Sequence, residues 1–306
     1  MGGESAMAGA TPVKVAAVDI GTNSVRLLIA DTGAGGTHAL TRLVAVTRLG
    51  EGVDNSGILT DSAMERTVHV LARYGEVASA EGATAVAVAT SAVRDAANRE
   101  EFLQRATAVL GVRPRLLSGA EEADMSRRGA AEGWRRPLAV IDVGGGSTEF
   151  SFSSGDAYSI DIGSVRLTER HLPTRPAAEA QVTVAMCHVA GLMSRIEVAV
   201  PPVTVLGVGG TFTSLAAIHL DLDAYDPDVV HGTKLEEEVL GRQVERLASM
   251  TVEETAGIPS LDPGRAPVLL GGAIVALQAV RRLRTGSVTV SEHDLLWALA
   301  GEAAQT

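Results

Sequence analysis

Hydrophobic and polar positions along the chain form two kinds of pattern: short apolar runs typical of strands, and the wider spacing typical of helices. Continuous apolar runs, typical of strands buried in a sheet, lie at 13–20, 24–30 and 84–90, and a run of mixed alternation lies at 38–49. The segment 138–163, which contains the glycine run at 144–146, has the same character on both sides of that run. Strands of this kind, separated by helical segments, predict a mixed α/β fold.

Helical spacing occupies much of the remaining chain. Met64, Val68 and Leu71 share one face of a predicted helix that begins at Thr60 or Asp61. Similar patterns predict further helices at 98–111, 119–134, 177–196, 211–220, 235–249, 266–284 and from 292 onward. Short apolar runs predict strands at 113–118, 203–210 and 287–291.

The order of these elements is repeated. Asp19-Ile-Gly-Thr-Asn-Ser and Asp142-Val-Gly-Gly-Gly-Ser each lie between two predicted strands and begin a similar order of strands and helices. We interpret the repeat as two ribonuclease-H-like domains, 13–125 and 126–291, facing each other across a cleft, with a last helix in 292–306 packing back on the first. Chance similarity between two glycine-rich turns is the alternative.

Composition narrows the function classes. The 306 residues carry a net charge of −11, which argues against general binding of nucleic acid. A single cysteine, Cys187, excludes an internal disulfide framework, and its apolar helical surroundings predict a buried side chain. The start of the chain is short and polar, and no apolar run reaches the ~18 residues of a membrane span. We therefore expect a cytoplasmic protein.

The two glycine-rich bends suit phosphate. Consecutive backbone N–H groups at such a bend form a concave anion site, and glycine allows close approach. The candidate phosphate-binding residues are Gly21, Thr22, Asn23 and Ser24 in the first bend, and Gly144, Gly145, Gly146, Ser147 and Thr148 in the second. A third run contributes Gly209 and Gly210, which end a strand and open a helix; close packing of strand and helix explains that run equally well.

Carboxylates beside these bends point to a metal ion. A carboxylate would repel phosphate unless a cation lies between them, and Mg²⁺ takes one or two carboxylates together with phosphate oxygens and water. Asp19, Asp142 and Glu149 are therefore candidate metal ligands. For each aspartate, the alternative is a turn residue that bonds its own backbone.

Six segments together resemble the Ppx/GppA family, which contains exopolyphosphatases and guanosine pentaphosphate phosphohydrolases. These segments are 16–30, 89–98, 116–123, 140–150, 163–169 and 205–211. The likeness covers nearly the whole chain from Val13, and "SGAEEA" combined with "IDVGGGSTE" is its most specific part. The resemblance implies the actin-like ATPase fold of the superfamily that also holds acetate and sugar kinases and heat-shock chaperones.

The resemblance also implies roles for individual residues. The family's catalytic glutamate, which activates water against a terminal phosphate, matches Glu122, and the neighbouring Glu121 stays open as the alternative. Arg94 matches an arginine that binds phosphate oxygens. Arg26 lies on an otherwise apolar strand, so it needs a partner or a cleft, and Arg166 lies where the family brings a basic side chain towards the groove. Lys234 and Arg265 are further cations that could contact a long polyanion.

These observations predict a Mg²⁺-dependent phosphoanhydride hydrolase, with Mn²⁺ as an alternative ion and any need for a monovalent cation left open. Inorganic polyphosphate is the favoured substrate, guanosine pentaphosphate the near competitor, and a small-molecule kinase the more distant one. We expect the family's short two-domain form, and a homodimer is compatible with the resemblance. Many family members have arginine where this chain has Asp124, and Arg127 and Arg128 are close enough in sequence to compensate its charge.

Overall fold

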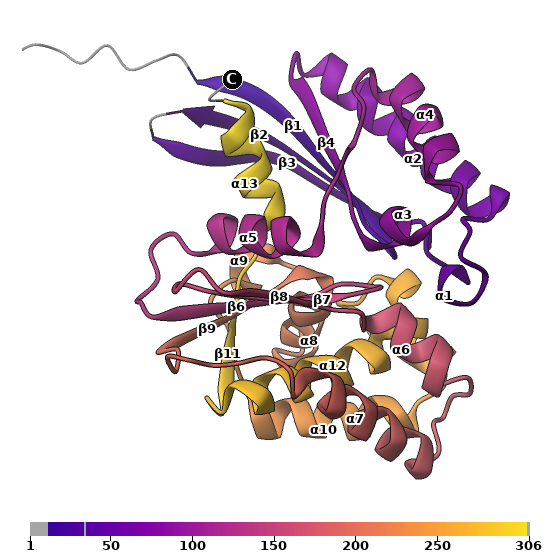
Figure 1. Ribbon diagram of the computed structural model, residues 1–306, viewed down its shortest axis with the longest axis vertical. Helices are drawn as coiled ribbons and strands as arrows, with labels where there is room; N and C mark the ends of the chain where they lie inside the picture. The colour runs from indigo at the N-terminus through magenta and orange to yellow at the C-terminus, as the bar shows by residue number, and fades with distance from the viewer. Residues whose placement is uncertain (1–11, 34, 305–306) are drawn as a thin grey trace, which may run out of the picture.

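The computed structural model describes residues 12–33 and 35–304 of the chain. The short polar start of the chain, which contributed to the expectation of a cytoplasmic protein, lies outside the described residues, as do the last two residues of the predicted C-terminal segment. The described chain folds into an upper half and a lower half, each built on one β-sheet with helices against it (Figure 1). This arrangement confirms the mixed α/β class.

The N-terminal half contains a five-stranded sheet in the order β3-β2-β1-β4-β5. Its strands are β1 Val13–Ile20, β2 Ser24–Gly33, β3 Gly36–Val46, β4 Thr84–Ala89 and β5 Arg115–Leu116. Its helices are α1 Val53–Ser56, α2 Asp61–Ala80, α3 Ser91–Asp95 and α4 Arg99–Leu110, and α5 Gly119–Ala130 leads to the other half. The predicted strands 13–20 and 84–90 are thus confirmed to within a residue, whereas the predicted strand 113–118 shortens to two residues.

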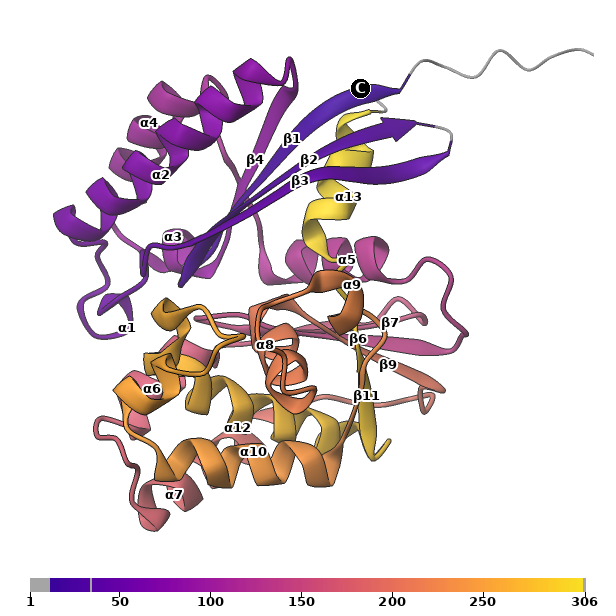
Figure 2. The same cartoon turned by 180° about the vertical axis from the view of Figure 1, so that it is seen from behind.

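The C-terminal half contains a six-stranded sheet in the order β10-β11-β9-β6-β7-β8. Its strands are β6 Leu138–Val143, β7 Thr148–Phe152, β8 Ala157–Ile160, β9 Thr204–Val208, β10 Lys234–Glu236 and β11 Ser287–Val290. Its helices are α6 Ser164–His171, α7 Glu179–Met193, α8 Gly209–His219, α9 Pro227–Val230, α10 Glu237–Ser249, α11 Val252–Ala256 and α12 Ala266–Leu283, with a 3₁₀ turn at Pro263–Arg265 before α12. Figure 2 shows α8 and α9 from behind.

The internal repeat is visible in the strand pairing. In the first sheet β1 is antiparallel to β2 and parallel to β4; in the second, β6 is antiparallel to β7 and parallel to β9. The register places Asp19 opposite Arg26 and Asp142 opposite Glu149, so the two motif copies occupy equivalent positions. This duplicated topology is the ribonuclease-H-like pair predicted from the sequence.

Local chemistry explains where the helices begin and end. The Thr60 side chain accepts a hydrogen bond from the amide of Ala63, which selects Thr60 over Asp61 as the cap of α2. Helix α4 ends at Gly111, whose φ of 71° is the left-handed conformation that glycine adopts without strain. Asn98, the first residue of the helix predicted at 98–111, makes no side-chain capping bond to α4; its side chain bonds the amide and the carbonyl of Leu59.

The last helix, α13 Leu295–Ala303, returns to the N-terminal half. Its residues share a hydrophobic cluster with Val15 and Ala17 of β1 and Leu28 of β2, together with Met125 of α5. The other end of α5 packs with Leu138 of the second sheet. The proposed division between residues 125 and 126 falls inside α5, because this helix contributes to clusters on both sides; we keep the division as a proposal.

Two apolar helices differ from each other in burial. The segment Pro263–Leu283, which includes α12, is by length and composition apolar enough to cross a membrane, but 78% of an apolar 18-residue window within it is buried inside the protein, in the core of the C-terminal half. Cys187 on α7 is exposed, so the prediction that it lies in the core is wrong. Only Ala185, Val189 and Met193 of α7 are buried, and Cys187 lies on the opposite face of that helix.

Candidate active site

The two glycine-rich bends have the same turn and touch each other. The Gly21 amide donates to the Ser24 carbonyl at 3.0 Å, and the Gly144 amide donates to the Ser147 carbonyl at 3.1 Å. A Cβ atom added to Gly145 would lie 2.8 Å from Cβ of Thr22, so only glycine allows the bends to approach this closely. The duplicated sequence therefore produces one shared site between the halves.

A cavity of about 80 Å³ lies between the bends. Its wall includes every residue of the first bend, Gly144, Gly145 and Ser147 of the second, Gly209 and Gly210 of the third glycine run, and the side chains of Asp19, Arg26, Glu122 and Asp142. Within the described chain, the amides of Thr22, Asn23 and Gly145 donate to no protein acceptor. The cavity thus offers free N–H donors to a small anion.

Arg26 joins two buried carboxylates beside this cavity. Its Nη2 and Nε lie 2.6 and 3.0 Å from Oδ2 of Asp19, and its Nη1 pairs with Asp294. Burial by itself would lower the pKa of Arg26, but Asp294 and Asp19 raise it well above its ordinary value. The cation on an apolar strand therefore has both a partner and a place on the cavity wall.

Asp294 was missed by the sequence analysis. It caps α13 by accepting from the amide of Leu296, and an aspartate before an apolar helix signals only that capping role. Its pairing with Arg26 depends on the return of α13 to the first sheet, which no local pattern specifies.

Asp142 and Glu149 face each other across β6 and β7. Ser126 donates to Oδ2 of Asp142 at 2.7 Å, and Ser159 donates to Oε1 of Glu149 at 2.8 Å. Oε2 of Glu149 is buried and has no hydrogen-bond partner. Burial raises the pKa of Asp142 to about 6, and burial together with the charge of Asp142 raises the pKa of Glu149 to about 8.

The raised pKa of Glu149 predicts how stability varies with pH. The folded protein keeps a proton on Glu149 that the unfolded chain has released, so stability falls as pH rises from the ordinary value of 4.5 towards about 8. Between pH 6 and pH 8 in the presence of EDTA, we expect the unfolding free energy of wild type to fall. For Glu149→Gln, which has no titrating carboxyl at this position, we expect the fall over the same range to be smaller by about 2 kcal/mol. Urea unfolding at both pH values measures this difference, and equal pH slopes for the two proteins would contradict it.

Glu121 and Glu122 have different environments. The Glu122 side chain is buried on the cavity wall, and Nη1 of Arg94 lies 3.4 Å from its Oε2. Burial and then the charges of Glu149, Asp142 and Asp19 raise the pKa of Glu122 well above its ordinary value, while Arg94 lowers it. Glu121 is exposed and completes a capping box with Ser118, whose hydrogen bonds lower the pKa of Glu121. The structure thus separates two carboxylates that adjacent sequence positions could not.

Arg94 lies behind Glu122 and does not line the cavity. Its Nη1 donates to the Leu117 carbonyl at 3.1 Å as well as approaching Glu122, and its Nε lies 3.8 Å from Asp95. These contacts fix the orientation of Glu122. Direct contact between Arg94 and phosphate, as the family resemblance implies, would need the side chain to turn away from them.

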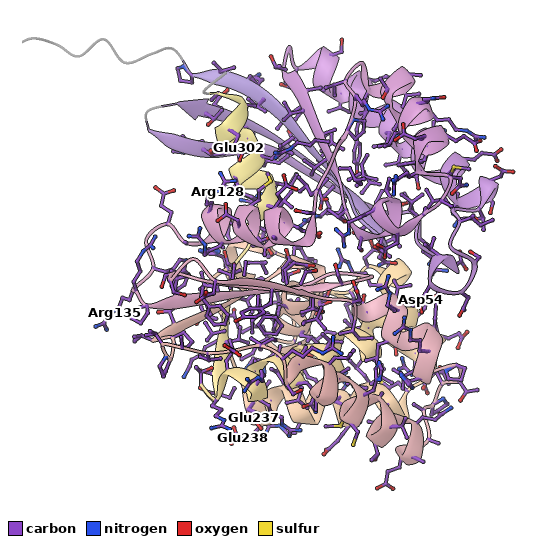
Figure 3. The ribbon with its side chains drawn as sticks, in the orientation of Figure 1. Asp54, Arg128, Arg135, Glu237, Glu238 and Glu302 are labelled. Atoms are coloured by element: carbon purple, nitrogen blue, oxygen red, sulfur yellow. The ribbon has the colours of Figure 1, made fainter. Side chains whose placement is uncertain are left out.

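Thr148 and Arg166, both predicted to bind phosphate, do not line the cavity in this structure. Thr148 is fully buried, and its hydroxyl donates to the Ile162 carbonyl at 2.6 Å, which turns it away from the cavity. Arg166 pairs with Asp95 at 2.6 Å and with Asp54 at 3.0 Å, because these carboxylates of the N-terminal half face it. Figure 3 shows Asp54 where α1 of the N-terminal half faces α6 of the C-terminal half.

Gly146 and the third glycine run also depend on close approach. A Cβ atom at Gly146 would lie 2.6 Å from Oγ of Ser91, so this glycine allows packing beneath the cavity. Gly209 has φ of +81° and approaches Oδ1 of Asp142. At Gly210 a Cβ atom would meet the guanidinium of Arg265, which also lines the cavity and has no hydrogen-bond or ion-pair partner in the described chain. The third run therefore serves close packing and brings Arg265 to the site.

Known proteins are similar to this chain in sequence and in fold. The model of the Ppx/GppA phosphatase family matches residues 28–296. Exopolyphosphatase 2 of Mycobacterium tuberculosis is 39% identical over 94% of this chain and 97% of its own length. The crystal structure of an exopolyphosphatase-like protein is 35% identical, with a TM-score of 0.89, and the match covers 96% of this chain and 99% of that protein. The crystal structure of the Aquifex aeolicus Ppx/GppA family member is 30% identical, with a TM-score of 0.80, and the match covers 96% of this chain and 98% of that protein. The chain belongs to the Ppx/GppA phosphatase family.

Proposed function

We propose that the protein is an exopolyphosphatase, a phosphoanhydride hydrolase that releases orthophosphate from the end of inorganic polyphosphate. The observation that carries the proposal is the buried carboxylate of Glu122 on the wall of a cavity that two phosphate-type bends enclose. The names of the relatives at 39% and 35% identity support the same activity.

In the proposed reaction, the bends bind the terminal phosphoryl group and Glu122 prepares water for attack. Free amides of Thr22, Asn23 and Gly145, with Arg26 and Arg265, bind its oxygens. The water oxygen forms a bond to phosphorus, the bond from phosphorus to the bridging oxygen breaks, and Glu122 accepts the water proton. Arg94 holds Glu122 in position and opposes part of the rise in its pKa that burial and the neighbouring carboxylates cause.

The carboxylates fit a divalent cation that substrate helps to bind. Within residues 12–33 and 35–304, no three acidic, histidine or cysteine side chains form a ready-made metal site. Mg²⁺ needs only one or two carboxylates, and buried oxygens of Glu149 and Asp19 have no hydrogen-bond partner. We propose Asp142 and Glu149 as holders of Mg²⁺, or alternatively Mn²⁺, with Asp19 partly committed to Arg26. The ion would neutralise charge on phosphate oxygens.

One observation favours a second candidate, hydrolysis of the terminal phosphate of guanosine pentaphosphate. A pocket of about 480 Å³ adjoins the cavity and shares Arg26, Gly209, Gly210 and Arg265 with it. Leu28, Leu43 and Trp297 give this pocket apolar walls, which suit a nucleoside. The kinase alternative has no comparable support. A cytoplasmic location and a homodimer stay predictions, as does the absence of nucleic-acid and membrane partners.

Product analysis tests the proposal. An enzyme that removes terminal phosphates should release orthophosphate from the first turnovers, while the length of the remaining polyphosphate, measured by gel electrophoresis, decreases gradually. Chains of intermediate length appearing before orthophosphate would show internal cleavage and contradict it. The Glu122→Gln protein provides the background for both measurements.

A further inference from the structure

A groove of about 830 Å³, separate from the cavity and from the pocket beside it, lies on the C-terminal half. It is formed by the loop after α5, the loop before β9, strand β10 and the end of α12. We call it the basic groove, after the charged residues in its wall, which includes Trp134, Arg135, Pro202, Lys234, Arg282 and Arg284.

The wall of the basic groove carries only positive charge. No aspartate or glutamate lines it, although the chain as a whole has 37 acidic and 26 basic residues. Arg135 and Arg284 are exposed, and neither side chain has a hydrogen-bond or ion-pair partner in the part of the chain that the structure describes. Lys234 pairs with Glu236, and Arg282 bonds the Met193 and Ile196 carbonyls. Two cations are therefore free to bind an anion and Arg282 adds to the local positive potential, whereas Glu236 offsets the charge of Lys234.

The basic groove and the cavity lie at opposite ends of the same strands. Strand β6 begins at Leu138, next to the loop that carries Arg135, and ends beside Asp142 on the cavity wall. Its six residues span roughly 20 Å. Figure 3 shows Arg135 projecting from the edge of the C-terminal half, away from the junction at Asp54. A short phosphate chain bound at the cavity would not reach this groove, whereas a long one would.

A row of rings connects the groove with the pocket beside the cavity. Trp134 lines the groove and Trp297 lines the pocket. Between them lie His231 and His293, with successive centroid distances of 6.1, 4.9 and 4.6 Å. Arg42 lies over the Trp297 ring at 4.8 Å. Because Arg42 also pairs with Glu292 at 3.7 Å, the row connects the two sites through aromatic and imidazole rings rather than through free positive charge.

We propose that the basic groove binds the distal part of a long polyphosphate chain whose terminal phosphate occupies the cavity. The inference rests on the proposed function for its choice of polyanion. Charge complementarity supports it, because an all-cationic wall on a protein of net charge −11 favours a polyanion. The groove makes the apparent affinity depend on chain length, since two linked contacts reinforce each other.

The test compares a groove variant with a variant of equal charge change. The groove variant carries Arg135→Gln and Arg284→Asn; asparagine tolerates the φ of 56° at position 284. The control carries Arg73→Gln and Arg242→Gln, which are exposed and have no ion pair in the described chain. For the groove variant, we expect KM for long-chain polyphosphate to rise about fivefold to tenfold, with kcat for tripolyphosphate and its KM unchanged. The control should match wild type.

Binding of long-chain polyphosphate to Glu122→Gln protein, with and without the groove substitutions, makes the inference independent of turnover. We expect the groove substitutions to weaken this binding by a similar factor, and less so at high salt. Equal binding and equal long-chain KM in the groove and control variants would overturn the inference. A loss confined to a fluorescent guanosine triphosphate would also overturn it, because the occupant would then be a nucleotide. Absence of hydrolysis by wild type would instead overturn the proposed function, while the binding comparison still decides the role of the groove.

Discussion

Replacing Glu122 with glutamine should lower kcat for phosphate release by about 10³-fold, with substrate affinity within about threefold of wild type. Glutamine keeps the shape of the side chain and a carbonyl oxygen near Arg94, which lies 3.4 Å from Oε2 of Glu122, but it cannot accept a proton from water. Steady-state kinetics give kcat, and binding of unhydrolysed polyphosphate gives the affinity.

The neighbouring Glu121→Gln is the matched control. Glu121 is exposed, and its side chain accepts hydrogen bonds from the amide and hydroxyl of Ser118 in a capping box that glutamine can also complete. We expect kcat within about twofold of wild type. A large loss in Glu121→Gln, or retained activity in Glu122→Gln, would contradict the assignment of the base.

Gly129→Ala should destabilise the protein by about 3 kcal/mol. A Cβ atom at position 129 would lie 1.8 Å from the carbonyl oxygen of Asp294, so α5 and α13 would have to separate. That separation would also disturb Asp294, which caps α13 and pairs with Arg26. Chemical unfolding measures the loss of free energy, and we expect phosphatase activity to fall along with stability.

Gly191→Ala provides the comparison within another helix. Gly191 lies in α7, and a Cβ atom there would meet no atom within 4 Å. Alanine in an open helical position should leave stability unchanged or raise it by up to ~1 kcal/mol. Equal unfolding free energies for the two variants would show that the contact between α5 and α13 does not limit stability.

The sequence predicted the two glycine-rich bends of the site, because residues adjacent in the chain determine their turns. The two bends, with Gly21 and Gly144 in the same turn, follow from residues adjacent in the chain, and their duplication predicted the facing sheets. The spacing of Ser118 and Glu121 is itself a capping-box signature, which could have assigned Glu121 to helix capping from the sequence.

Contacts between distant segments could not be predicted this way. Arg26 and Asp294 meet because α13 crosses back to the first sheet, and Arg166 is neutralised by Asp54 and Asp95 because the halves close against each other. Composition was misleading at Cys187, because an apolar helix need not be buried on every face. Asp124 pairs with Arg127 and Arg128, as their spacing suggested, and these pairs lower its pKa against the effect of burial.

The most direct test of the central claim is phosphate release from long-chain polyphosphate, guanosine pentaphosphate and ATP, assayed side by side with Mg²⁺. The proposed function predicts that wild type releases orthophosphate from polyphosphate with the highest kcat/KM, and that EDTA or the Glu122→Gln substitution removes this activity. Release no faster than the Glu122→Gln background from all three substrates would contradict it, and a higher kcat/KM for guanosine pentaphosphate would favour the second candidate.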